Sequence, residues 1–159
     1  MIIKTADLCD SYPEKINIAN PIFRDFGQKL AFAGNIITIK CSNDNSLVRD
    51  ALESSGHNNV LVIDGGASME CALLGDQLAE LACKNHWEGI VVNGCIRDAA
   101  EILQINIGVK AITTHPLKSI KRGVGEKNIS VDFAGISFAP GDYLYADIDG
   151  VIVTPSKLT

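Results

Sequence analysis

The strongest constraint on the fold is a strand–helix–strand pattern in the middle of the chain. Residues 60–63 form an apolar run that ends in a turn at residues 64–66, and residues 89–92 form a second apolar run. Two strands joined through a helix make a βαβ unit, whose strands are parallel. We therefore expect a parallel sheet covered by helices. Between the two runs, apolar residues recur at the spacing of one helix face: Leu78, Ala79, Leu81 and Ala82.

Helices and strands alternate on both sides of this unit, as they do in an α/β domain. Asn45 or Ser46 is expected to cap a helix that ends at Gly56, because small polar residues favour helix starts and glycine favours helix ends. The remaining predicted elements are helices over residues 5–12 and 99–103 and strands over residues 30–41 and 109–113.

After Gly125 the pattern changes to short alternating runs separated by glycines, which is typical of antiparallel strands. No linker divides the chain, and its 159 residues are the length of one domain. We expect a single α/β domain over residues 1–159, with a central βαβ unit, a β-rich C-terminal part and sheets in more than one layer. The C-terminal runs cover residues 129–133, 136–138, 143–146 and 151–153.

The charge balance argues against nucleic acid as a ligand. The chain carries 14 Lys and Arg residues against 19 Asp and Glu residues, a formal net charge of -5. Proteins that bind nucleic acid need a basic surface that neutralises phosphates. We therefore expect no direct binding of nucleic acid.

Cysteine usage and the length of the apolar runs indicate a cytoplasmic protein. The five cysteines are an odd number without a C-x-x-C pair, which fits neither a disulfide framework nor a zinc site. No apolar run approaches the roughly 18 residues that a membrane span needs. Asp7 interrupts the N-terminus before an apolar signal segment could form. We expect a cytoplasmic location and no membrane contact.

Two polar segments fall where parallel strands end and helices begin, which is where open α/β sheets bind ligands. The first segment opens the central helix, and its free backbone N–H groups could hold a small anion. In the second segment, Arg97 could bind a carboxylate through two hydrogen bonds, and Asp98 could hold a hard divalent cation. The first segment consists of Gly75, Asp76, Gln77 and Leu78.

Helix capping is the alternative interpretation of both aspartates. Asp76 and Asp98 each stand where a helix favours an N-cap residue. Asp98 is followed three residues later by Glu101, the spacing of a capping box. Such caps satisfy backbone N–H groups and need no ligand, so the spacing alone leaves both roles open.

The same residues carry a resemblance to a known family. Asp76, twenty intervening residues and then Arg97-Asp98 resemble the D-x20-R-D motif of the class II 4-hydroxy-4-methyl-2-oxoglutarate aldolase family. That family includes the regulator of ribonuclease E activity A. The likeness extends over nearly the whole chain. The other segments that carry it are residues 5–10, 34–38, 62–66, 87–89 and 141–147.

The resemblance implies a fold, an assembly and a reaction. The fold would be a β/β/α swivelling-type domain, and the assembly a homotrimeric ring with sites near the subunit interfaces. The reaction would be a cleavage of 4-hydroxy-4-methyl-2-oxoglutarate to two pyruvates that depends on Mg²⁺ or Mn²⁺. Decarboxylation of oxaloacetate passes through the same pyruvate enolate, so one site could support both reactions. The substrates would thus be small 2-oxo acids.

The resemblance also implies a role for each site residue. The first segment would hold the 2-oxo acid through backbone N–H groups, and Arg97 would bind its carboxylate. Asp98 would hold the metal, and Asp76 would orient a metal-bound water. Neither segment contains a Schiff-base lysine, as befits a class II enzyme.

The general acid or base is a further expectation of the resemblance. Longer aldolases of the family carry a C-terminal extension that adds a glutamate from the neighbouring subunit, whereas this chain stops at Thr159. Asp147 and Asp149 are the candidates to replace that glutamate. Ordinary turn positions are the alternative for both residues.

A second function follows from the regulator in the same family. The protein would then bind an RNase E-type ribonuclease and slow RNA decay, and its negative charge suits a basic partner surface. The presence of Asp98 after Arg97 favours the metal-dependent enzyme. A basic stretch over residues 118–127 is expected to be a solvated loop, with a lid or a partner contact as the alternative.

Overall fold

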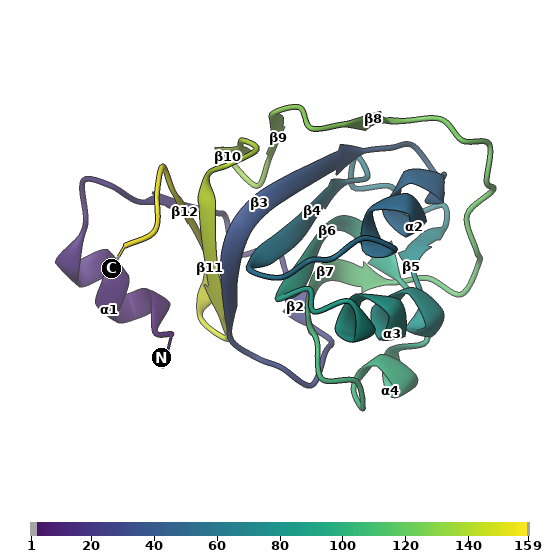
Figure 1. Ribbon diagram of the computed structural model, residues 1–159, viewed down its shortest axis with the longest axis horizontal. Coiled ribbons are helices and arrows are strands. Elements are labelled where there is room, and N and C mark those ends of the chain that lie inside the picture. The colour runs from purple at the N-terminus through teal and green to yellow at the C-terminus, as the bar shows by residue number, and fades with distance from the viewer. Residues whose placement is uncertain (1–2, 159) are drawn as a thin grey trace.

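Parallel strands form the centre of the main sheet in the computed structural model, which describes residues 3–158 (Figure 1). In order across the sheet they are β3 (Phe32–Lys40), β4 (Asn59–Asp64), β6 (Gly89–Ile96) and β7 (Gly108–Thr114). Val60 of β4 pairs in parallel with Gly89 of β6. The two apolar runs are therefore neighbouring strands, and the predicted βαβ unit is confirmed.

Helices cover one face of this sheet (Figure 1). They are α2 (Ser46–Leu52), α3 (Asp76–Lys84) and α4 (Ala99–Ile102). Leu78, Ala79 and Ala82 of α3 are buried and pack in one core cluster with Ile90 and Val92 of β6. Side chains one and four positions apart share a helix face, so a single apolar stripe holds α3 on the sheet. The start of α3 is thereby fixed beside the ends of the parallel strands.

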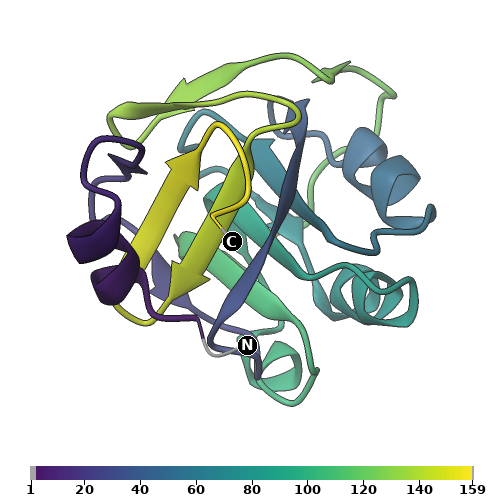
Figure 2. The same ribbon diagram turned by 60° about the vertical axis from the view of Figure 1, so that its left-hand side comes forward.

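An antiparallel hairpin widens the sheet beyond β3. Its strands are β11 (Tyr143–Asp147) and β12 (Gly150–Thr154), and β11 pairs with β3. Helix α1 (Thr5–Ser11) packs against this hairpin (Figure 2). Short strands complete the edges, with β1 (Asn17–Ile18) beside β12 and β2 (Arg24–Asp25) beside β7.

A second hairpin, β9 (Val131–Phe133) and β10 (Ile136–Phe138), covers the face opposite the helices. The side chains of β4 contribute to the cores on both faces of the sheet, because successive side chains of a strand point to opposite faces. Leu61 and Ile63 belong to the core under the helices, whereas Val60 and Val62 belong to the core under the hairpin. The layers are thus hairpin, sheet and helices, which confirms the expected mixed β/β/α sandwich.

The structure corrects the predicted end of β6. The apolar run stops at Val92, but the strand continues to Ile96 and all of its residues are buried. Asn93 breaks the apolar pattern, yet its amide donates a hydrogen bond to the Asp64 carboxylate at 2.9 Å, so this polar group is satisfied inside the protein. The additional length of β6 pairs with β5 (Ala72–Leu74), a strand that the sequence pattern does not predict.

The segment that joins β7 to β9 runs along the edge where the parallel strands end (Figure 1). It contains β8 (Glu126–Lys127), which pairs with β3.

None of the helices within residues 3–158 has both the length and the apolar character that crossing a bilayer requires.

Candidate functional site

The two predicted site segments meet at one end of the sheet. Leu74 of β5 pairs with Ile96 of β6, and the backbone N–H of Arg97 donates to the Leu74 carbonyl at 2.9 Å. The chain leaves both strands directly after this pairing. Gly75 and Asp76 therefore lie beside Arg97 and Asp98, as the resemblance implies.

Neither aspartate forms the side-chain cap that its spacing suggests. Gly75, not Asp76, occupies the N-cap position of α3, and neither α3 nor α4 shows a side-chain capping bond within residues 3–158. Asp98 does occupy the N-cap position of α4, in the left-handed conformation with φ 57° and ψ 42°. Its Oδ2 instead accepts a hydrogen bond from the backbone N–H of Asp76 at 3.1 Å. Asp98 thus faces the start of the neighbouring helix α3 rather than its own helix.

Gly75 makes this approach possible. A Cβ atom at this position would lie 2.8 Å from Oδ2 of Asp98 and 3.5 Å from Nε of Arg97. The first distance is shorter than any ordinary contact, so a side chain would displace the carboxylate. The requirement for glycine comes from space, because its φ of -122° is open to any residue.

The environment favours the protonated form of Asp76. Burial raises the pKa of its carboxyl group, and a hydrogen bond with the Asp98 side chain and the charge of Asp98 raise it further. Two carboxylates held together repel each other when both are ionised. A proton or a cation placed between them relieves that repulsion, so the pair is suited both to proton transfer and to cation binding.

A cavity of about 170 Å³ opens on this pair. Its volume is below the roughly 300–1,000 Å³ of most ligand pockets, which indicates a small metabolite. All residues predicted for substrate and metal binding contribute to its wall: Gly75, Asp76, Gln77, Leu78, Arg97 and Asp98.

Three cationic side chains in the same wall were not among the predicted site residues. Arg49 comes from α2, and Lys118 and Lys121 come from the segment between β7 and β8. Asn45 lines the cavity as well, four residues before Arg49. That i, i+4 spacing on a predicted helix is the signal that could have placed Arg49 beside Asn45.

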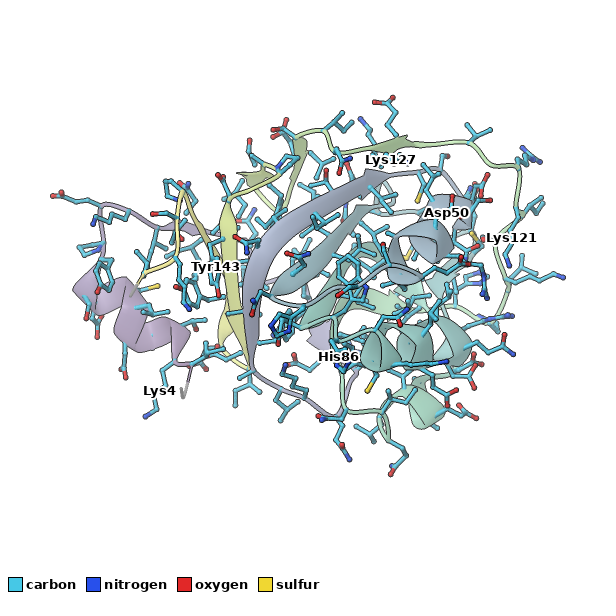
Figure 3. The ribbon with its side chains drawn as sticks, in the orientation of Figure 1. Lys4, Asp50, His86, Lys121, Lys127 and Tyr143 are labelled. Carbon is cyan, nitrogen blue, oxygen red and sulfur yellow. The ribbon has the colours of Figure 1, made fainter. Side chains whose placement is uncertain are left out.

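The basic stretch is held against the protein rather than freely solvated. The buried carboxylate of Asp44 accepts hydrogen bonds from the backbone N–H groups of Arg122 at 2.8 Å and Val124 at 3.1 Å. It also accepts bonds from Ser46, and together these bonds hold the pKa of Asp44 well below its usual range, although burial opposes them. Lys121 lies on this anchored segment, at the right-hand edge of the molecule (Figure 3). The stretch therefore forms one rim of the cavity.

The two acidic residues considered as a general acid or base lie elsewhere. Asp147 is the last residue of β11, where it accepts hydrogen bonds from the backbone N–H groups of Thr5 and Asp149. These bonds and one from the Thr5 hydroxyl lower its pKa against the effect of burial. Asp147 thus joins α1 to the hairpin, and Asp149 is an exposed residue of the turn between β11 and β12.

The fold and the site define a class of protein, a β/β/α domain with an arginine–carboxylate site where two parallel strands end. The chain belongs to the RraA-like family, described as Aldolase/RraA, whose family model matches residues 5–153. A protein from Pseudomonas putida (strain W619), provisionally named a 4-hydroxy-4-methyl-2-oxoglutarate aldolase, is 53% identical over 154 residues, which are 97% of this chain and 94% of that protein.

Two solved structures share the fold closely. One, from Geobacillus kaustophilus HTA426, is described as an S-adenosylmethionine:2-dimethylmenaquinone methyltransferase; it is 46% identical with a TM-score of 0.96, covering 98% of this chain and 97% of that one. The other is an RNA-processing inhibitor RraA from a Thermus species, 40% identical with a TM-score of 0.96, covering 100% of this chain and 96% of that one. The family expected from the sequence is thereby confirmed.

Proposed function

We propose that the protein is a divalent-metal-dependent aldolase that cleaves 4-hydroxy-4-methyl-2-oxoglutarate to two pyruvates and also decarboxylates oxaloacetate. One observation carries the proposal: the Asp98 carboxylate lies against the first N–H of α3, in a small cavity that Arg97 also lines. The provisional name of the Pseudomonas putida relative agrees with this reaction.

Substrate binding uses the start of α3 and Arg97. The first N–H groups of a helix have no partner within the helix, so Gln77 and Leu78 offer donors to a carboxylate or a 2-oxo group in the cavity. The guanidinium of Arg97 binds the carboxylate next to the 2-oxo group, and two parallel hydrogen bonds fix its orientation. The substrate is thereby held with its 2-oxo group towards Asp98.

Asp98 is the residue that would hold the cation. Within residues 3–158, no three His, Cys, Asp or Glu side chains gather closely enough to hold a metal ion by themselves. Mg²⁺ often binds one or two carboxylates and takes its other ligands from water and substrate, and Mn²⁺ also favours oxygen ligands, so a carboxylate open to the cavity fits either ion. When bound, the cation would act as a Lewis acid that polarises the 2-oxo group and stabilises the negative charge of the enolate.

Asp76 moves the proton in this proposal. The C4 hydroxyl of the substrate loses its proton, the C3–C4 bond breaks, and the bonding electrons pass into the enolate of one pyruvate while C4 becomes the carbonyl carbon of the other. Asp76, directly or through a water that it orients, takes the hydroxyl proton. A proton returned to C3 then converts the enolate into pyruvate. Its raised pKa suits both transfers. With oxaloacetate, loss of carbon dioxide leaves the same enolate.

Direct assay of the reaction tests this function. Pyruvate release is measured from 4-hydroxy-4-methyl-2-oxoglutarate and from oxaloacetate, with Mg²⁺ or Mn²⁺ and again with a chelator. Turnover that the chelator abolishes and added metal restores supports the proposal. An absence of turnover with both substrates contradicts it.

Regulation of an RNase E-type ribonuclease is the second candidate. It is favoured by the 40% identity to the RNA-processing inhibitor from Thermus, and the net charge of -5 suits a basic partner surface.

We propose a homotrimer in the cytoplasm for either function, and the five free thiols agree with a reducing compartment. Sedimentation tests the trimer, and a pull-down at moderate salt tests the ribonuclease contact, which a failure to retain the nuclease would exclude.

A further inference from the structure

Arg49 lines the same cavity as the two site segments, on a helix that packing holds in place. Val48 and Leu52 of α2 are fully buried, so the helix cannot turn about its axis without exposing them. The backbone N–H of Arg49 donates to the Asn45 carbonyl at 3.2 Å. Residues four apart share one helix face, and the shared face of Asn45 and Arg49 borders the cavity.

Asn45 ties this helix to the strand that leads into the site. Its side-chain amide donates to the Leu73 carbonyl at 3.1 Å, two residues before Gly75. Its side-chain oxygen accepts a bond from the Ser119 hydroxyl at 2.7 Å, which also connects it to the cationic segment. The position of Arg49 relative to the start of α3 is therefore set by hydrogen bonds and not by packing alone.

The cavity holds more positive than negative charge, although the protein is acidic. Its wall carries four cationic side chains against the carboxyl groups of Asp76 and Asp98. Within residues 3–158 the ion pairs are Lys29 with Glu88 and Lys110 with Asp25, so none of the four cavity cations takes part in one. Unpaired cations around a small cavity attract a ligand with more than one negative charge. The four cations are Arg49, Arg97, Lys118 and Lys121.

Among these cations, Arg49 is the best placed to recognise a second carboxylate. Arg97 lies beside Gly75 and Asp98, and the proposed function assigns it to the carboxylate next to the 2-oxo group. Lys118 and Lys121 are exposed on an irregular segment, whereas Arg49 is half-buried on a packed helix. A guanidinium also matches the geometry of a carboxylate, and holding it costs less conformational entropy when its backbone is already fixed.

We propose that Arg49 binds the distal carboxylate of the substrate and makes the site selective for 2-oxo acids with a second carboxylate. This inference rests on the proposed aldolase function and adds to it a residue that determines specificity. Arg97 and Arg49 then hold the two ends of one small dianion, which places the bond to be cleaved between them.

A pair of substrates that differ only at the distal group tests the proposal. The value of kcat/KM is measured for 4-hydroxy-4-methyl-2-oxoglutarate and for 4-hydroxy-4-methyl-2-oxopentanoate, in which a methyl group replaces the distal carboxylate. We expect Arg49→Gln to lower the value about 10- to 100-fold for the dicarboxylate, the range of a charged hydrogen bond, and less than about threefold for the monocarboxylate. Arg49→Lys, which keeps the charge, is expected to recover part of the loss. An equal effect on both substrates, or none on either, overturns the proposal.

Arg122→Gln is the matched control, because it removes the same charge from the neighbouring segment outside the wall of the cavity. It should leave the ratio between the two substrates unchanged. Calorimetric binding of 2-oxoglutarate and 2-oxopentanoate, with Mg²⁺ present, separates the two levels of failure because it needs no turnover. If the wild type cleaves nothing, the aldolase function fails, yet loss of the preference for 2-oxoglutarate in Arg49→Gln still supports the role of Arg49. If the preference is absent in the wild type or survives in the variant, the role of Arg49 is refuted.

Discussion

The carboxylate of Asp98 accepts a hydrogen bond from the backbone N–H of Asp76 at 3.1 Å, although the two residues follow different strands. This contact joins the end of β6 to the start of α3 and places both carboxyl groups on one cavity beside Arg97. The proposed function depends on this arrangement.

Gly75→Ala should reduce activity by at least about tenfold while the protein stays folded. The new Cβ would lie 2.8 Å from Oδ2 of Asp98, and a small misplacement of a catalytic group costs a large factor in rate. Gly94→Ala is the control, because a Cβ there would meet its nearest neighbour, Cδ1 of Leu73, at an ordinary 3.5 Å. Steady-state kinetics and thermal unfolding of both variants check the prediction. Equal activity in Gly75→Ala and the wild type would show that the close contact between Gly75 and the Asp98 carboxylate is unimportant for activity.

Asp76→Asn should lower activity and raise stability at neutral pH. The folded protein holds the pKa of Asp76 above its unfolded value, so this carboxyl adds stability below the unfolded pKa, and that contribution is lost as pH rises through the folded pKa. An amide carries no charge to repel Asp98 and can still donate a hydrogen bond to it. Thermal unfolding at neutral and at acidic pH measures the difference. A variant less stable than the wild type at neutral pH contradicts the raised pKa.

Asp44→Ala should destabilise the protein by about 2–4 kcal/mol, because several donors lose a buried charged acceptor. The folded state lowers the pKa of Asp44, so its stabilisation is present above the unfolded pKa and is lost as pH falls through the folded one. Denaturant unfolding gives the free energy, and hydrogen exchange at Arg122 and Val124 should become faster. Asp50→Ala, at an exposed position of α2, should change stability by less than about 0.5 kcal/mol. Similar losses in the two variants would remove the special role of Asp44.

Arg97→Ala should raise KM for both substrates by about 10- to 100-fold, since a carboxylate loses its charged hydrogen bonds. Arg97→Lys keeps the charge but not the planar pair of donors, so it should lie between the wild type and the alanine variant. Initial-rate kinetics at saturating metal separate KM from kcat. A change confined to kcat would show that Arg97 acts on the transition state without holding the ground-state substrate.

The sequence predicts those parts of the fold that follow from local periodicity. β4 and β6 are recognisable because each contains a continuous apolar run, and α3 is recognisable because its apolar residues recur on one helix face. β5 is not, since Ala72–Leu74 is only three residues long and its pairing depends on the part of β6 beyond Val92, which the apolar pattern does not predict. The same part of β6 brings the two site segments together. The motif can therefore be recognised in the sequence, but the contact between its two segments cannot be predicted from it.

Side-chain roles were harder to predict where they depend on distant contacts. Asp98 occupies the N-cap position of α4, as its spacing predicts, but its side chain forms no capping bond there, because its carboxylate accepts the N–H of Asp76 at the start of α3. The place of Lys121 at the cavity depends on hydrogen bonds to Asp44, which precedes it by more than seventy residues. Arg49 is not among the site residues predicted from the sequence, although its i, i+4 spacing from Asn45 can be read there.

The role of Asp98 in metal-dependent cleavage can be tested by one comparison. Pyruvate release from 4-hydroxy-4-methyl-2-oxoglutarate is measured for the wild type and Asp98→Ala across a range of Mg²⁺ and Mn²⁺ concentrations. Glu101→Gln serves as the control, because this exposed residue lies on α4 outside the wall of the cavity. We expect metal-dependent turnover to be lost in Asp98→Ala and kept in Glu101→Gln. Turnover in Asp98→Ala with the metal response of the wild type would contradict this role.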